Sequence, residues 1–305
     1  REFVLDLSGQ KALGQLVHNC SPDFGRVHLG ESFEPDPTVS FPMGSVMQRY
    51  LYHSVLAGVQ QREFDRVIRL EFANARGMGP QSRCFVIAEI MGRHSNVIIT
   101  DAKNAILESS KHVSAAVNRY RQIQPGLDYV PPPDFDKLDP AALDLSVLLE
   151  SASENAAYTR NWFRSTLQGA SDVFRDESLA RAGIDPQRPA DELTEEAVQR
   201  LVGVMQELLD EAVQGGSRIY ECADERFAYP TVLQCRPDCR SSEVESINAA
   251  IHRVADERLT SIEIEQLRDR LRQTAGDALE LAVQRLKERR EALERGRDAG
   301  KLREI

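Results

Sequence analysis

Short apolar runs separated by polar breaks dominate the first 133 residues, and this pattern predicts β-strands more than helices. The segments expected to be strands are residues 3–8, 26–29, 66–72, 83–91 and the Val- and Ile-rich run that follows residue 96. One helix is expected over residues 43–58, where Val46, Tyr50 and Leu51 share a face and Gly58 ends the segment. A polar break, Gly–Arg–His–Ser–Asn at residues 92–96, joins the last two strands, and such loops carry function more often than fold.

The two strands on either side of the Gly-rich loop read as a hairpin whose register can be predicted. If Phe72 faces Arg83 across the loop, the alternation of side chains places Arg66 opposite Glu89 at the far end. The sequence therefore predicts an ion pair between Arg66 and Glu89 on one face of the sheet.

Polar side chains that are distant in sequence should converge at this end of the hairpin. Asp65 and Ile90 fall opposite each other on the reverse face, and the polar break with Arg93 and His94 begins there. Two interpretations remain open from these residues alone. The charges form either a salt bridge at the solvent edge, worth about 0–1 kcal/mol and without function, or part of a binding site.

The second half of the chain predicts helices. Residues 141–213 contain several helical stretches, with Trp162 expected in the core. Residues 167–172, followed by a helical segment, resemble a helix–hairpin–helix. Its Gly169 turn would either expose backbone N–H groups to a phosphate or serve packing alone.

The C-terminal region reads as a short hairpin at residues 218–235 and one long charged helix at 243–305. The helix has a narrow apolar seam made of Leu267, Leu271, Ala275, Ala278, Ala282 and Leu286. Such a seam is typical of one arm of an antiparallel coiled coil, and a helix on the surface of a globular domain is the alternative.

The predicted fold class is α+β. After the prolines at 131–133 the composition becomes acidic and helical, which marks a domain boundary. The expected organisation is a mixed α/β domain at 1–133, a helical helix–hairpin–helix domain at 134–215, a connecting β-hairpin at 216–242 and a coiled-coil arm at 243–305.

The chain carries a net charge of −10, but the charge is unevenly distributed. Residues 43–126 carry +5, whereas residues 127–231 carry −12. Separation of this kind suits a protein that docks one face on a polyanion, although accidental surface variation would look similar.

Several classes of protein are disfavoured. No apolar run is long enough for a transmembrane helix, and the first residues read as a strand and not as a signal peptide. Five scattered cysteines suggest a reduced cytosolic protein, and the spacing of Cys235 and Cys239 has no matching second pair for a metal site. No nucleotide-binding or hydrolase motif occurs, so neither a catalytic centre nor a cofactor is expected.

One resemblance is specific. The stretches M-G-R-H-S-N at residues 91–96, V-N-R-Y-R at 117–121 and P-G at 125–126 closely resemble the NFACT family, which includes bacterial RqcH and eukaryotic NEMF and was once described as fibronectin-binding protein A. The Asp65–Arg66 pair looks like that family's functional Asp–Arg motif, and Glu89–Ile90 matches a second functional pair. The similarity is strong over 1–133 and weaker but collinear beyond.

The resemblance implies a cytoplasmic factor of ribosome-associated quality control. Such a factor binds the large ribosomal subunit and its rRNA while a stalled nascent chain is still attached to tRNA, and it recruits alanyl-tRNA for template-free C-terminal tailing. The ribosome forms the bonds, so the factor is not an enzyme, and no membrane is involved. The amino-terminal domain would be glycosylase-like in fold.

The residues that the resemblance and the polar loops assign to tRNA binding are Asp65, Arg66, Glu89, Ile90, Arg93, His94, Lys111, Asn118, Arg119 and Arg121. The family's first residues, second coiled-coil arm and C-terminal domain are not matched, so tailing by this chain alone is not expected. A fibronectin-binding adhesin and a glycosylase-like DNA-binding protein are the alternatives.

Overall fold

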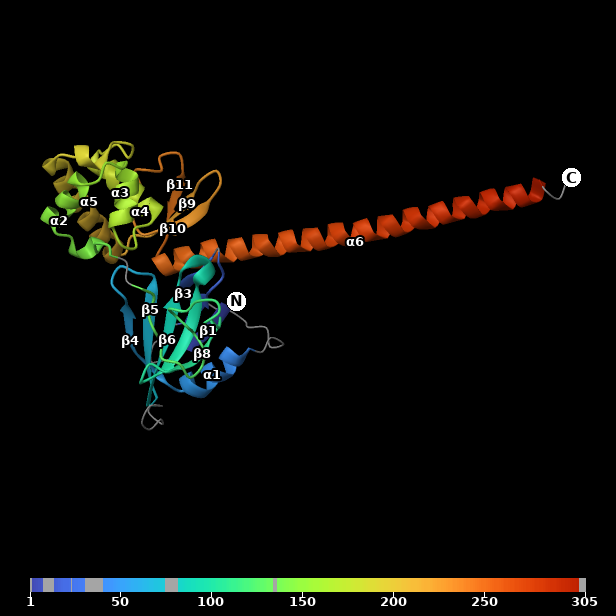
Figure 1. Ribbon diagram of the computed structural model, residues 1–305, viewed down its shortest axis with the longest axis horizontal. Coiled ribbons are helices and arrows are strands. Elements are labelled where there is room, and N and C mark those ends of the chain that lie inside the picture. The colour runs from blue at the N-terminus through green and yellow to red at the C-terminus, as the bar shows by residue number, and fades with distance from the viewer. Residues whose placement is uncertain are drawn as a thin grey trace. The chain divides into compact units, whose positions relative to one another are not determined.

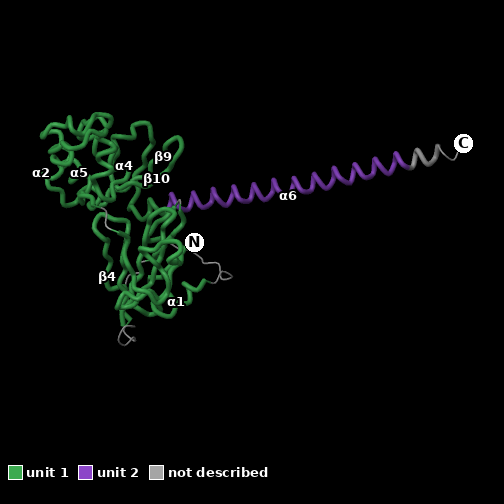
Figure 2. The backbone as a smooth tube through the Cα atoms, viewed as in Figure 1, with its two compact units in different colours: residues 1–252 green, residues 253–305 purple. Residues whose placement is uncertain are grey.

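The computed structural model describes residues 2–7, 14–22, 24–30, 41–74, 82–133 and 136–301. The chain forms two compact units, Arg1–His252 and Arg253–Ile305 (Figure 2). The first unit combines antiparallel sheets with helices, and the second is helical (Figure 1). The α+β class predicted from the sequence is therefore confirmed.

Two antiparallel sheets and one helix build the first part of the chain. Their elements are β1 (Glu2–Leu7), β2 (Gly14–Asn19), β3 (Arg26–Gly30), α1 (Pro42–Leu51), β4 (Val55–Gln61), β5 (Val67–Ala73), β6 (Arg83–Glu89), β7 (Asn96–Asp101) and β8 (Ile106–Ser109). Strands β1–β2–β3 form one sheet, and β4 to β8 form a five-stranded meander in chain order. Such consecutive antiparallel pairing is the simplest way to connect neighbouring strands.

The central strands of the five-stranded sheet are buried on both faces. One face contributes Leu70 and Val86 to a core shared with Phe3 of the other sheet and with Met47 of α1. The other face, around Ile87, packs against the loop that follows β8. Continuous apolar runs result, because neither face of the central strands meets water.

The hairpin register differs from the prediction by one residue. The structure pairs Phe72 with Cys84 and Val67 with Glu89, so Arg66 does not face Glu89. A shift of one residue moves every side chain to the opposite face. Strand β6 is apolar on both faces between Cys84 and Ala88 and offers no alternation that could fix the register. Strand β5 does alternate, with Arg69 and Glu71 on the face opposite Leu70, but this alternation alone does not define the partner residues.

The predicted helix at 43–58 is also only partly right. Met43, Met47 and Leu51 form the buried stripe of α1, spaced four residues apart. The helix ends at Leu51, and His53 adopts a positive φ of 59°. The chain then enters β4, which pairs with β5 and so satisfies its backbone in a sheet.

Four helices form a separate core: α2 (Leu145–Ser153), α3 (Thr159–Thr166), α4 (Asp172–Ala182) and α5 (Glu195–Gln214). Trp162 is fully buried in this core, as predicted, and its Nε1 donates a hydrogen bond to Ser151 Oγ at 3.1 Å. The indole thus combines a large buried surface with a satisfied polar atom.

The turn between α3 and α4 serves packing. Gly169 has a φ of 64°, and a Cβ atom placed there would lie 1.8 Å from the carbonyl oxygen of Phe64. The Phe64 ring also lies 6.1 Å from that of Phe174, measured between centroids. The turn therefore meets the loop before β5, which favours the packing interpretation of the glycine over phosphate binding.

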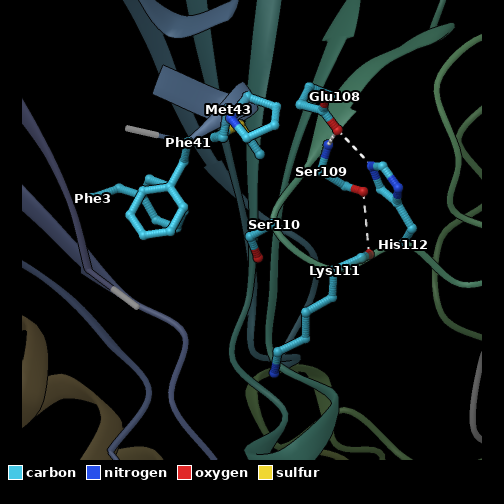
Figure 3. Close-up of a pocket in the computed structure, with 9 residues that line it drawn as sticks. Phe3, Phe41, Met43, Glu108, Ser109, Ser110, Lys111 and His112 are labelled. Carbon is cyan, nitrogen blue, oxygen red and sulfur yellow. Dashed lines mark hydrogen bonds and ion pairs between the residues drawn. The ribbon is translucent and has the colours of Figure 1, made fainter. Parts of the chain in front are cut away.

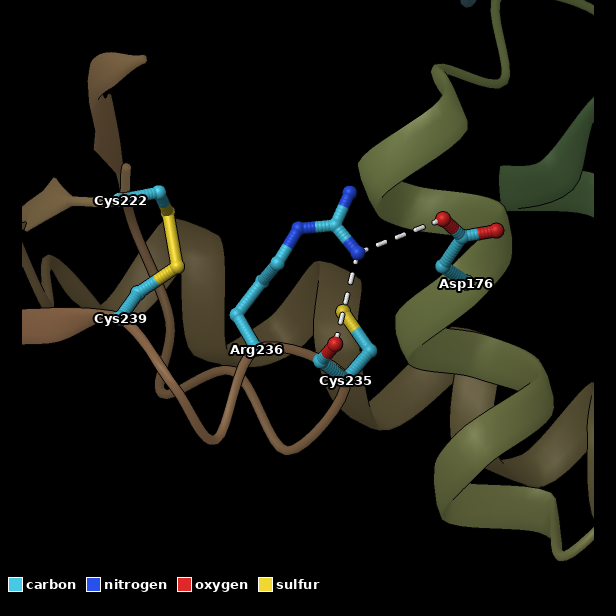
Figure 4. Close-up of a disulfide and its surroundings, with 5 residues drawn as sticks. All are labelled: Asp176, Cys222, Cys235, Arg236 and Cys239. Carbon is cyan, nitrogen blue, oxygen red and sulfur yellow. Dashed lines mark hydrogen bonds and ion pairs between the residues drawn. A yellow bond between two sulfur atoms is a disulfide. The ribbon is translucent and has the colours of Figure 1, made fainter. Parts of the chain in front are cut away.

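The hairpin predicted at residues 218–235 is part of a three-stranded sheet in the structure. Strands β9 (Arg218–Glu221), β10 (Arg226–Tyr229) and β11 (Arg240–Glu243) form a sheet in the order β10–β9–β11. Glu221 pairs with Arg240, so the adjacent Cys222 and Cys239 come together, with their Cα atoms 4.5 Å apart, and form a disulfide (Figure 4). The expectation that all cysteines are reduced is wrong for this pair.

Helix α6 (Ile247–Lys301) is anchored to the first sheet at its start. The Leu29 backbone N–H donates to Asn248 Oδ1 at 3.0 Å, and the rings of His28 and His252 meet at 3.4 Å between nitrogens. The leucines of the predicted seam are exposed in the described part of the chain, with Leu267 at 52% and Leu286 at 57%. Pairing of this helix with a second coiled-coil arm remains a prediction.

Substitution of Gly169 by alanine should destabilise the protein by at least about 2 kcal/mol, because the new methyl group would collide with the Phe64 carbonyl and the left-handed backbone would be strained. Gly203 lies within α5 with open space around its Cβ position, and Gly203→Ala should stabilise the helix by about 0.5–1 kcal/mol. Urea unfolding measures both. Equal stability of Gly169→Ala and the unchanged protein would contradict the packing.

Stability should fall as the pH drops from about 6.5 towards 4. Burial, with Arg26 nearby, lowers the pKa of His18 and of His28 to about 4, and His252 contributes at His28. Each imidazole takes up its proton more readily in the unfolded chain. The free energy of unfolding is therefore highest above pH 6.5, and below it decreases by up to roughly 1.4 kcal/mol per histidine for each unit that the pH falls. Urea unfolding between pH 7.5 and 5.5 should show this slope, and His28→Leu should reduce it. An unchanged slope would argue against the buried neutral imidazole.

Candidate nucleic-acid interface

The Gly–Arg–His–Ser–Asn break begins with a short 3-10 helix, η2 (Gly92–His94). The two residues that follow it, Ser95 and Asn96, hold the local backbone in place. Ser95 Oγ accepts a hydrogen bond from the Met91 backbone N–H at 2.9 Å. Asn96 Oδ1 accepts from the Lys111 backbone N–H at 3.0 Å, and its Nδ2 donates to the Lys111 carbonyl at 2.8 Å. Both side chains are buried, so half of this motif fixes the backbone of the loop and of Lys111.

The other half of the motif is exposed. Arg93 Nε lies 3.0 Å from His94 Nε2 at the surface. Lys111 Nζ donates to the carbonyl oxygens of Arg93 and Cys20, each at 3.3 Å. Arg93, His94 and Lys111, here called the loop cluster, therefore lie together although they are distant in sequence.

A backbone hydrogen bond of the sheet brings the Asp65–Arg66 pair close to the loop cluster. The Asp65 carboxylate is buried and accepts a hydrogen bond from the Arg66 backbone N–H at 2.7 Å. The Arg66 carbonyl accepts from the Ile90 N–H at 2.9 Å, two residues before η2. The Arg66 side chain is exposed and makes no ion pair with the described residues. The predicted convergence of these segments is thus correct, although the Arg66–Glu89 ion pair is not formed.

Glu89 is paired instead with Arg121. Its carboxylate is fully buried and accepts from Arg121 Nη1 at 3.0 Å and also from Nη2, while Tyr129 Oη donates at 2.8 Å. Arg121 Nε donates to the Val130 carbonyl at 2.6 Å. Burial and the negative Glu89 raise the pKa of Tyr129, so its phenol remains a donor.

This ion pair fastens an exposed loop to the sheet. Asn118 Oδ1 accepts from the backbone N–H groups of Tyr120 and Arg121 at 3.0 and 3.1 Å, which closes a tight turn. Arg119 is exposed beside it, and Val117 and Tyr120 are 77% and 69% exposed. The sequence prediction included Arg119 but missed Tyr120. An aromatic residue between two arginines was the available signal.

The predicted site residues therefore have two kinds of environment. Asp65, Glu89 and Arg121 are buried or nearly so and hold the backbone in place. The exposed side chains are Arg66, Arg93, His94, Asn118 and Arg119, with Lys111 and Ile90 half-buried. Cations carried on a rigid backbone are suited to phosphate contacts.

Two further properties bear on the chemistry of this region. Within the described ranges, no three His, Cys, Asp or Glu side chains are placed to hold a metal ion. Among those same residues, no helix is both long and apolar enough to cross a membrane.

The sequence matches the family described as NFACT N-terminal and middle domains over residues 1–305. The chain therefore belongs to the NFACT family. It is 30% identical over 162 residues to the Rqc2 homolog RqcH of Streptococcus suis, which covers 53% of this chain and 29% of the relative. For the RqcH of Bacillus subtilis the identity is 28% over 171 residues, covering 56% of this chain and 30% of the relative. The match thus spans less than a third of these relatives.

Solved structures show the same fold. The N-terminal part of the fibronectin/fibrinogen-binding protein of Streptococcus suis superposes with a TM-score of 0.68 at 22% identity, covering 84% of this chain and 88% of the other. The fibrinogen-binding protein of Staphylococcus aureus gives a TM-score of 0.64 at 22% identity, covering 78% and 82%. A short stretch of 66 residues is 41% identical to a formamidopyrimidine-DNA glycosylase of Thermus thermophilus, covering 21% of this chain and 24% of that enzyme.

Replacing Arg121 by alanine should destabilise the protein by about 3–5 kcal/mol, because Glu89 would remain buried without its partner. Arg119→Ala, two residues away and exposed, is the matched control and should change stability by no more than about 0.5 kcal/mol. Chemical denaturation measures both values. Equal stability of the two variants would show that the pair does not hold the loop.

Proposed function

We propose that this protein acts in ribosome-associated quality control. It binds the large ribosomal subunit and rRNA while a stalled nascent chain is still attached to tRNA, and it recruits alanyl-tRNA for template-free tailing. The ribosome forms the peptide bonds, and the protein itself has no catalytic role. Membership of the NFACT family and similarity to RqcH proteins support this proposal and a cytoplasmic location.

The observation that carries the proposal is the set of exposed cations at one end of the five-stranded sheet. Arg66 and Arg93 extend from neighbouring strand ends, and Arg119 extends from the turn fastened by the Glu89 ion pair. Residues 43–126, which include these cations, carry +5 in a chain of net charge −10. The surface of this segment therefore attracts a polyanion that the rest of the chain repels.

We assign different roles to the two kinds of side chain. Arg66, Arg93, His94, Lys111 and Arg119 contact tRNA phosphates and loop nucleotides. Asp65, Glu89, Ile90, Asn118 and Arg121 position the backbone that carries them. Tyr120 is exposed between two arginines and is suited to stack on an unpaired base.

The double variant Asp65→Ala, Arg66→Ala should lose tailing and tRNA recruitment, because it removes both the exposed cation and the carboxylate that orients its backbone. Arg83→Ala is the matched control. This arginine lies at the other end of the same hairpin, and its side chain is 64% exposed and pairs with Glu71. The measurement is recovery of the large subunit and tRNA with tagged full-length protein from lysate, followed by analysis of tailed chains.

The unchanged protein and Arg83→Ala should recover both RNAs. Failure of the unchanged protein to recover either the large subunit or tRNA would refute the proposed function. Normal tailing by the double variant would remove Asp65 and Arg66 from the site and leave them a structural role.

A further inference from the structure

A pocket of about 410 Å³ lies next to the loop cluster and has one apolar and one polar wall (Figure 3). Phe3, Phe41 and Met43 line one side, and Glu108, Ser109 and His112 line the other. Lys111 belongs both to this pocket and to the loop cluster. The pocket is therefore contiguous with the cations proposed to contact tRNA.

The polar wall offers an unused hydrogen-bond acceptor. Glu108 Oε1 accepts from the Ser109 backbone N–H at 2.8 Å and contacts His112 Nε2 at 2.6 Å. The Glu108 side chain is 12% exposed, and its Oε2 has no hydrogen-bond partner among the described residues. A nearly buried carboxylate with one free oxygen favours a ligand that donates a hydrogen bond, and it disfavours a phosphate.

The apolar wall is suited to a flat ring. Phe41 is 41% exposed and so is accessible to a ligand, whereas Phe3 and Met43 line the same pocket at 9% and 2% exposure. Figure 3 shows Phe3 and Phe41 on the side of the pocket opposite Glu108 and His112. Aromatic side chains paired with a polar group that reads the base edge are how proteins hold unstacked bases of RNA.

We infer that this pocket binds one unstacked RNA base that carries an exocyclic amino group, with the amino group donating to Glu108 and the ring packed against Phe41. The inference rests on the proposed function. Cytosine presents an amino group where uracil presents a carbonyl oxygen, and that oxygen would face the negative carboxylate. The pocket should therefore favour cytosine over uracil in the same RNA.

The test uses the full chain and RNA hairpins that carry a single bulged nucleotide, either cytosine or uracil, or no bulge. Fluorescence anisotropy at fixed salt gives the dissociation constants, and tRNA is measured alongside. The cytosine bulge should bind about tenfold more tightly than the uracil bulge, the effect of one charge-assisted hydrogen bond. The hairpin without a bulge should bind no more tightly than the uracil bulge.

Three variants locate the effect. Glu108→Gln keeps the shape of the side chain but can donate to uracil, so the preference for cytosine should fall to within about twofold. Phe41→Ala should weaken both bulged hairpins and leave their ratio unchanged. Glu207→Gln, an exposed residue on α5, is the matched control and should retain the preference.

The outcomes separate this inference from the proposed function. Equal binding of the cytosine and uracil bulges by the unchanged protein would overturn the base pocket, and so would a preference that survives Glu108→Gln. In either case, retained tRNA binding would leave the proposed function standing. Absence of binding to tRNA and to every hairpin would overturn the proposed function itself.

Discussion

The buried ion pair between Glu89 and Arg121 is the constraint on which the candidate site depends. Glu89 ends strand β6 and is fully buried, where an unpaired carboxylate would cost several kcal/mol. Arg121 satisfies it with two nitrogens, and Tyr129 adds a third donor. The loop that carries Arg121 and Tyr129 must therefore close over this face of the sheet, and the exposed turn at Asn118 follows from that closure.

A second group of buried polar atoms fixes the neighbouring segment. Asn96 holds both backbone groups of Lys111, and Ser110 Oγ donates to Asn96 Oδ1 at 2.8 Å. These bonds tie β7 to the chain after β8 and leave the Lys111 side chain to reach the Arg93 carbonyl. Preorganised cations lose less freedom on binding than mobile ones, so this rigidity benefits affinity.

The sequence predicted where polar segments meet but not which side chains pair. That the start of β5, the end of β6 and the η2 loop meet follows from strand order alone and is correct, although the strand ends differ from the prediction by one or two residues. Glu89 was assigned to Arg66, because the hairpin was the only long-range pairing that local patterns could supply. Its partner Arg121 comes from an irregular loop 32 residues away, which no periodicity describes. Glu108 was missed because the pocket that it lines also needs Phe3 and Phe41, which are distant in sequence.

Counting charges along a sequence does not distinguish cations that bind partners from cations used within the fold. In the acidic helical region, Arg181 lies between Glu177 and Glu211, and these carboxylates raise the pKa of its guanidinium. Within the basic segment at residues 43–126, Arg121 is likewise paired with Glu89, and the Arg69 guanidinium lies 3.7 Å from the centre of the Phe85 ring. Of Arg66, Arg69, Arg121 and Arg181, only Arg66 is exposed and without an ion pair among the described residues. The surface that can attract RNA is therefore smaller than the charge count suggests. It lies at the end of the sheet where Arg66, Arg93 and Arg119 are exposed. Buried carboxylates and amides hold the backbone there, so these cations are not needed for folding.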